Sequence, residues 1–140
     1  MKNETTGYRG YIGSRIYHCG DFPQYVQNMI IRHYCQKHHL TYLLSATEYA
    51  MPGCFMILEE VISAIQSVQG VVMFSIFMLP SSAQARKDIY KRILASGRTL
   101  HAALEDMSIQ SEADIQLVED VLNINKITKR EATHLNAVTA

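Results

Sequence analysis

Three side chains have the chemistry of acid–base catalysts, namely His101, Glu48 and Glu105. Histidine titrates near neutral pH, and a neighbouring carboxylate fixes its tautomer and raises its pKa. Glu105 follows His101 by four residues and is one expected partner of the imidazole. Glu48 is the other. This set suits proton transfer such as isomerisation, epimerisation or elimination. His101 and Glu48 also have structural explanations, because a lone histidine is more often structural and Glu48 could be a surface charge.

Seven further residues carry groups that hold an anionic ligand. Arg15, with the hydroxyls of Ser14 and Ser45, would bind a phosphate or carboxylate. The alternatives are turn residues, helix caps and, for a buried hydroxyl, a bond to a backbone carbonyl. The substrate-binding residues that we predict are Ser14, Arg15, Ser45, Thr47, Tyr49, Ser75 and Arg86.

Alternating strands and helices must position these side chains. Apolar runs predict strands at 7–14, 41–46, 71–77 and 99–104, and helical spacing predicts helices at 23–40, 54–68, 81–96 and 111–124. Units of ~30 residues predict right-handed crossovers and a parallel sheet. We therefore predict an α/β three-layer sandwich with a four-stranded, mainly parallel sheet in the order 2-1-3-4 and helices on both faces. Ligands bind beyond the carboxyl ends of such strands, where most of the predicted site residues fall.

Composition bounds the function. The 140 residues, 48% of them hydrophobic, predict one domain over 1–124, with 125–140 as a tail or an extra helix. Thirteen basic residues balance thirteen acidic ones, which argues against a nucleic-acid partner. No apolar run reaches the ~18 residues of a membrane span, so we expect no membrane partner. Cys19, Cys35 and Cys54 show no metal-binding spacing and predict free thiols in the cytoplasm.

No cofactor or metal is expected. The sequence has no glycine fingerprint for a dinucleotide. His38 and His39 are adjacent, so on a helix they point to different faces and make a poor metal pair. The helix at 23–40 is apolar almost all round, which predicts a homo-oligomer that could form through it.

Four segments together resemble the catalytic domain of the serine recombinases: YIGSR, VQNMIIRHYCQKHHL, GVVMFSIFMLP and ILASGRTLHAALEDMSIQSEADI. The resemblance implies a resolvase- or flavodoxin-like fold, with Ser14 at the position of the nucleophile. The chain has Phe77 and Met78 where the family motif has Asp-Arg, and EYAMPGCFMILEE lacks the family's arginines. Few cations are then left to stabilise a phosphoryl transition state, so DNA strand exchange is the function we expect least.

A second resemblance covers nearly the whole domain. GYRGYI, VQN, YLLSATEYAMPGC, FMLP and LHAALE resemble the motifs of the sporadic carbohydrate cluster proteins. That family implies bacterial gene clusters for surface sugars, including nonulosonic-acid-like pathways. The resemblance therefore predicts a small enzyme acting on a sugar or sugar phosphate. The alternative is a non-catalytic scaffold or regulatory partner in the same pathway.

Overall fold

A five-stranded sheet forms the centre of the fold. The structure, a computed structural model, describes residues 6–17 and 20–139, with side chains up to residue 127. The strands are β1 (Tyr8–Gly13), β2 (Tyr42–Glu48), β3 (Gly70–Met73), β4 (Thr99–Ala102) and β5 (Met107–Ile109). Their order is β2-β1-β3-β4-β5. The first four are parallel, whereas β5 runs antiparallel to β4.

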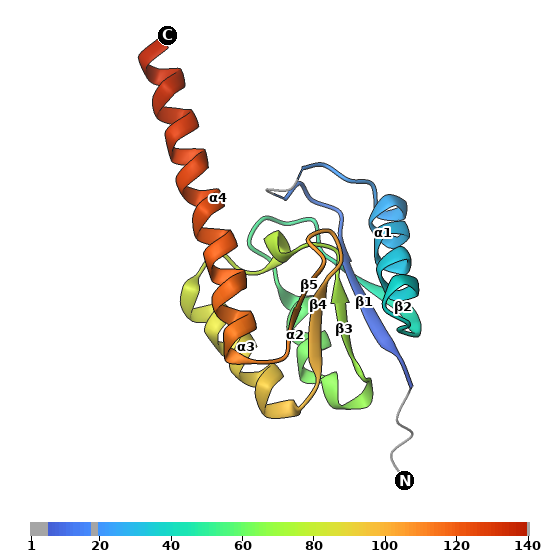
Figure 1. Cartoon of the computed structure of the whole chain (residues 1–140). Helices are drawn as coiled ribbons and strands as arrows, with labels where there is room; N and C mark the ends of the chain where they lie inside the picture. The colour runs from blue at the N-terminus through green and yellow to red at the C-terminus, as the bar shows by residue number, and fades with distance from the viewer. Residues whose placement is uncertain (1–5, 18–19, 140) are drawn as a thin grey trace.

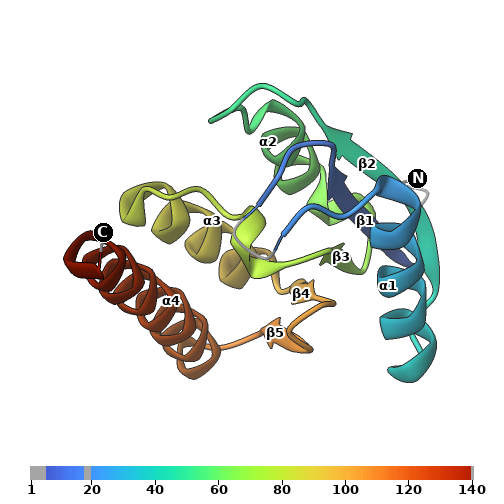
Figure 2. The same cartoon turned by 90° about the horizontal axis from the view of Figure 1, so that it is seen from above.

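Helices cover both faces of this sheet (Figures 1 and 2). They are α1 (Gln24–Lys37), α2 (Met56–Ser63), α3 (Ala83–Ser96) and α4 (Glu112–Thr139), with short 3₁₀ turns η1 (Ile65–Ser67) and η2 (Ile76–Met78). Figure 2 shows α1 on one face and α2 with α3 on the other. The first part of α4 runs beside α3, and its C-terminal part extends beyond the body of the domain (Figure 1).

Local signals explain how α3 begins and ends. The Ser82 hydroxyl accepts a 3.3 Å hydrogen bond from the Ala85 N–H and so caps the first turn. Gly97 follows the last turn at φ +70°, a left-handed conformation that costs glycine least.

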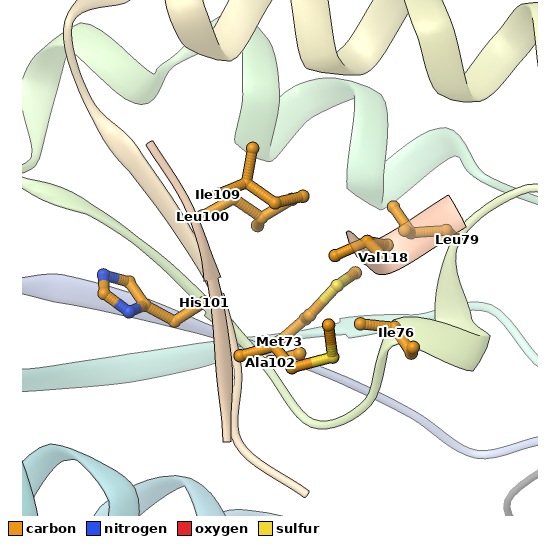
Figure 3. Close-up of a pocket in the computed structure, with 9 residues that line it drawn as sticks. Met73, Ile76, Leu79, Leu100, His101, Ala102, Ile109 and Val118 are labelled. Atoms are coloured by element: carbon orange, nitrogen blue, oxygen red, sulfur yellow. The ribbon is translucent and has the colours of Figure 1, made fainter. Parts of the chain in front are cut away.

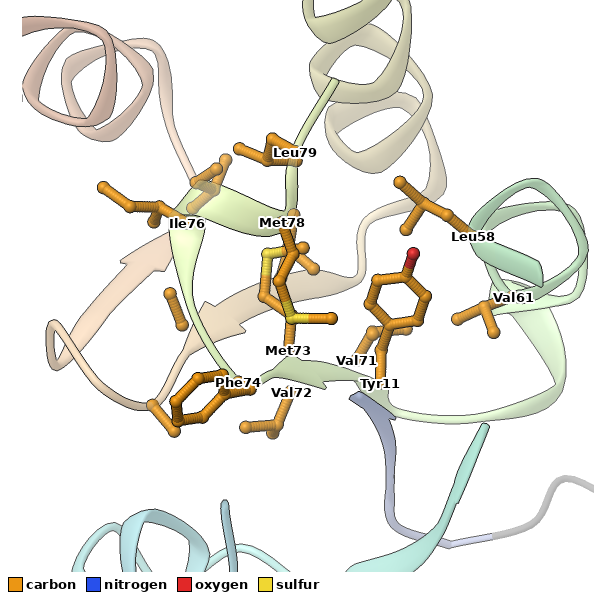
Figure 4. Close-up of a cluster of buried hydrophobic side chains, with 14 of the residues drawn as sticks. Tyr11, Leu58, Val61, Val71, Val72, Met73, Phe74, Ile76, Met78 and Leu79 are labelled. Carbon is orange, nitrogen blue, oxygen red and sulfur yellow. The ribbon is translucent and has the colours of Figure 1, made fainter. Parts of the chain in front are cut away.

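The core lies between β1, β3 and the helices. Figure 4 shows Tyr11 of β1 among Val71 and Met73 of β3, with its hydroxyl directed toward Leu58 of α2. All four residues of β3 are buried, as expected for a central strand covered on both faces. The core thus anchors the strands whose carboxyl ends carry the predicted site residues.

Close backbone approach joins β1 to β2. A Cβ on Gly10 would collide with the Ser45 hydroxyl on the neighbouring strand. Ser45 Oγ uses that space to contact Tyr42 Oη at 2.7 Å and to donate to Asn28 Oδ1 on α1 at 2.7 Å. Ser45, predicted to bind substrate, therefore links β2 to α1.

The α/β class, the helices on both faces and the 2-1-3-4 order are confirmed, but the predicted count of four strands is wrong. β5 has three residues, too few for a recognisable period of two. β3 ends at Met73 instead of 77, because the chain turns into η2, where Ser75 Oγ accepts from the Phe77 N–H at 3.2 Å. The tail from 125 continues α4 through Thr139.

Candidate functional site at the ends of β1 and β2

Ser14 lies where the topology favours a site. Because α1 and α2 leave on opposite faces, the sheet changes winding direction between β1 and β3, and ligands bind beyond the strand ends at such points. Gly13 of β1 pairs in register with Glu48 of β2, so Ser14 and Tyr49 leave the sheet at the same level. Both side chains are exposed. Among the described residues, the Ser14 hydroxyl has no hydrogen-bond partner.

Gln27 fixes the backbone immediately before Ser14. Its amide oxygen accepts from the Gly13 N–H at 3.0 Å, and its Nε2 donates to the Gly13 carbonyl at 2.6 Å and the Phe22 carbonyl at 2.8 Å. The side chain is 1% exposed. We did not single out Gln27 from the sequence. The available signal was a polar residue in the same helical stripe as Ile31 and Tyr34, which face the core.

Arg15 is held in place beside Ser14. Its Nη1 donates to the carbonyls of Met51 at 2.8 Å and Cys54 at 2.9 Å. The guanidinium carbon lies 4.9 Å from the ring centroid of Phe55 and 5.2 Å from that of Tyr17. Within the described parts of the chain, Nη2 and Nε have no hydrogen-bond partner. A fixed guanidinium with free donors is suited to a phosphate or carboxylate.

Glu48 is 1% exposed and accepts hydrogen bonds from both ends of the β2–α2 loop. Burial raises the pKa of this carboxyl, but bonds from the Tyr11 hydroxyl and three backbone N–H groups outweigh that effect and hold the pKa below its usual value. The carboxylate is thus ionised with its oxygens already occupied. These contacts favour a positioning role for Glu48. The catalytic role expected from the sequence stays a prediction.

His101 has both ring nitrogens occupied. Nδ1 lies 2.7 Å from the Tyr34 hydroxyl, and Nε2 lies 2.8 Å from the Thr99 hydroxyl. Burial, with a smaller effect of His38, lowers the pKa of His101 to about 4. Its ring is therefore neutral at physiological pH. The structure pairs it with neither Glu105 nor Glu48, the two partners considered from the sequence.

Glu105 instead holds the turn after β3. Its carboxylate accepts from the Ser75 hydroxyl at 2.7 Å and from the Ile76 N–H at 2.9 Å. Burial raises its pKa, although these hydrogen bonds act in the opposite direction. Ser75 is fully buried, so its hydroxyl faces this carboxylate and not a ligand.

Arg86 forms an ion pair with Glu119 of α4. Its Nε lies 3.0 Å from Glu119 Oε2, and its Nη1 donates to the carbonyls of Pro80 and Ser81 at 3.1 and 2.8 Å.

Thr47 is exposed at the end of β2. Of the predicted site residues, the structure therefore gathers Ser14, Arg15, Thr47, Glu48 and Tyr49 at one edge of the sheet. His101, Glu105, Ser75, Ser45 and Arg86 contact other parts of the structure.

Other possible sites are poorly supported. No group of three metal-ligating side chains occurs among the described residues. No described helix is long and apolar enough to cross a membrane. Cys35 and Cys54 are free thiols, while Cys19 lies outside the described residues. Figure 3 shows a small cavity lined by apolar side chains such as Leu100 and Ile109, with the His101 ring turned away from them.

Two solved structures share this fold. A resolvase family site-specific recombinase from Streptococcus pneumoniae superposes with a TM-score of 0.61 at 12% identity, covering 94% of this chain and 97% of that one. The N-terminal catalytic domain of TP901-1 integrase superposes with a TM-score of 0.56 at 13% identity, covering 87% and 97%. The chain thus has a resolvase-like fold. No family model matches the sequence, and no curated protein matches it significantly.

These comparisons contradict the function expected from the sequence. The predictions of a surface-carbohydrate enzyme or pathway partner, of a sugar ligand and of no nucleic-acid partner are wrong, because one neighbour is a site-specific recombinase and the other is the catalytic domain of an integrase. Balanced net charge is weak evidence against a nucleic-acid partner, because net charge sums over the whole surface and does not report local clusters of donors. A homo-oligomer through α1 is not tested by a single chain and stays a prediction.

Proposed function

We propose that this domain acts on DNA as a serine-dependent phosphoryl transferase, with Ser14 as the nucleophile. The Ser14 oxygen would attack a backbone phosphorus, a Ser–O–P bond would form, and the bond from phosphorus to the leaving sugar oxygen would break. The serine proton would be lost to solvent, and the sugar oxygen would take up a proton. Arg15 would hold the non-bridging oxygens of the phosphate through Nη2 and Nε.

One observation carries this proposal: an exposed serine leaves β1 beside an arginine that two backbone carbonyls already hold in place. Donors fixed before the reaction are worth more than mobile ones, because they need no reorganisation as charge develops. The fold shared with a site-specific recombinase and with an integrase catalytic domain supports the choice of DNA as substrate. A DNA substrate and free thiols fit the cytoplasmic location predicted from the sequence. That location stays a proposal.

Trapping of the covalent intermediate tests this function. The full chain would be incubated with a random-sequence duplex library, denatured in detergent and digested. Mass spectrometry would then search for a nucleotide linked through its phosphate to the Ser14 oxygen. We expect an adduct with the wild type and none with Ser14→Ala. If DNA is retained equally by both proteins, or no adduct forms, the strand-cleaving function is refuted.

A second candidate is DNA binding without cleavage. Phosphoryl transfer generally uses several cations, and two other arginines are already paired, Arg86 with Glu119 and Arg92 with Glu59. A shift of the duplex library in native gels, weakened by Arg15→Ala but without any adduct, would favour this candidate. Membership of the sporadic carbohydrate cluster family stays a proposal based on sequence motifs, and we attach no sugar chemistry to it.

A further inference from the structure

Glu48 makes no hydrogen bond to Arg15 but is connected to it through the loop between β2 and α2. Its Oε2 accepts from the Tyr11 hydroxyl at 2.7 Å and from the Leu58 N–H at 2.9 Å. Its Oε1 accepts from the N–H groups of Tyr49 at 3.2 Å and Ile57 at 3.1 Å. One buried carboxylate thus binds residue 49 at the start of the loop and residues 57 and 58 after it, and ties both to β1.

This carboxylate also replaces a missing helix cap. Phe55 occupies the N-cap position of α2 and offers no side-chain hydrogen bond. The N–H groups of Ile57 and Leu58, which a capping side chain would normally satisfy, are satisfied by Glu48 from the neighbouring strand. The start of α2 therefore depends on a residue that precedes it by eight positions.

Between these anchors, the loop directs two carbonyls at Arg15. The loop turns at Gly53, which has φ +73°, and the Cys54 N–H donates to the Met51 carbonyl at 3.2 Å. The same Met51 carbonyl and that of Cys54 accept from Arg15 Nη1. Because the two carbonyls belong to one closed turn, their position relative to β1 is set by the ends of the loop, which Glu48 holds.

We propose that Glu48 is a positioning residue for Arg15: it orders the 49–55 loop, whose carbonyls fix the guanidinium beside Ser14. This inference rests on the proposed function for its consequence in catalysis, but its structural part does not. Glutamine cannot replace glutamate here, because its amide would put N–H donors opposite the donors that now bind the carboxylate. Glu48→Gln should therefore loosen the loop while it preserves the size of the side chain.

The first arm of the test does not involve DNA. In the ¹⁵N-labelled full chain, the Arg15 Nε–Hε signal is assigned by its loss in Arg15→Lys, and exchange of the Leu58 amide is followed at the same time. Glu48→Gln should speed Leu58 exchange and shift the Arg15 signal toward that of a free arginine. An unchanged Arg15 signal with an opened Leu58 amide would overturn the inference.

The second arm is a double-mutant cycle on formation of the Ser14 adduct. Glu48→Gln alone should slow the adduct on the order of tenfold to a hundredfold, as expected when a catalytic group is misplaced. It should cause no further loss in the Arg15→Ala background, because the two residues act through one interaction. Independent losses in the two backgrounds would mean that Glu48 serves stability alone.

Two controls keep the outcome clear. Ser82→Ala removes a helix cap remote from the loop, and it should leave both the Arg15 signal and the adduct rate unchanged. If Glu48→Gln does not fold, Tyr11→Phe removes one donor to the same carboxylate and should give a smaller shift of the Arg15 signal in the same direction. A wild type without adduct refutes the proposed function, whereas the first arm still decides the positioning role.

Discussion

Acid should destabilise the folded domain through His101 before it does so through the carboxylates. His101 is 7% exposed, and burial lowers its pKa from 6.5 to about 4. Between these values the unfolded chain binds a proton that the folded chain does not. Stability is therefore full above pH 6.5 and is lost as the pH falls from 6.5 toward 4.

The size of the effect follows from the shift. Lowering the pKa of His101 from 6.5 to about 4 amounts to about 3 kcal/mol of stability when it is fully developed, and to about 2 kcal/mol between about pH 7 and pH 5. The carboxyls with lowered pKa, Glu48, Glu59 and Asp106, lose their contribution only below their ordinary values of 4.5 and 3.8. Glu105, with a raised pKa, acts in the opposite direction and reduces the loss near the acid end.

Urea unfolding at a series of pH values measures this free energy directly. The wild type should lose about 2 kcal/mol between about pH 7 and pH 5. The His101→Gln variant, which has no titrating ring, should start less stable and stay nearly flat over that range. An equal pH slope in both proteins would show that other groups carry the acid sensitivity and would refute the reasoning.

Three further changes test single contacts, each by urea unfolding unless stated. Arg86→Ala should cost about 3 kcal/mol because it leaves the Glu119 carboxylate without its cationic partner, and Arg86→Met with Glu119→Leu should recover part of this loss. A loss below about 1 kcal/mol would contradict a buried ion pair. Gly97→Ala should cost about 1 kcal/mol through its φ of +70° alone, since a Cβ there meets no atom within 4 Å; no loss would argue against this conformation. Ser75→Ala removes the 2.7 Å donor to Glu105 and should raise the pKa of that carboxyl further in an NMR titration, whereas an unchanged pKa would place the hydroxyl elsewhere.

The sequence predicted the fold better than the site, because the two depend on different information. Strands and helices repeat every two or 3.6 residues, so the sequence could indicate elements such as α1 and β2. The extent of β3 could not be read in this way, since the run from 71 to 77 stays apolar through the η2 turn. The turn that ends the strand is held by the Ser75 hydroxyl, which accepts from the Phe77 N–H and donates to Glu105, thirty residues later.

Site residues were chosen by type and by nearness to a strand exit, which does not give the direction of a side chain. His101 lies on β4 as predicted, but its ring faces Tyr34 of α1 and not the carboxyl edge. Glu48 lies at the expected edge, but it points inward to Tyr11. Ser14 and Arg15 after β1, like Thr47 and Tyr49 at the end of β2, lie at the edge where the strand rule places them.

The close approach of Gly10 to Ser45 also constrains how the sequence can change over time. A side chain at position 10 would collide with the hydroxyl and Cβ of Ser45, and the Ser45 Cα would lie 3.2 Å from the new Cβ. Substitutions at the two positions should therefore be linked in homologous sequences, with glycine kept at 10 wherever residue 45 has a side chain. Ser45 is in turn bonded to Asn28 and Tyr42, so the linked set extends from the sheet to α1. An alignment of relatives would record this as covariation between three segments that lie far apart along the chain.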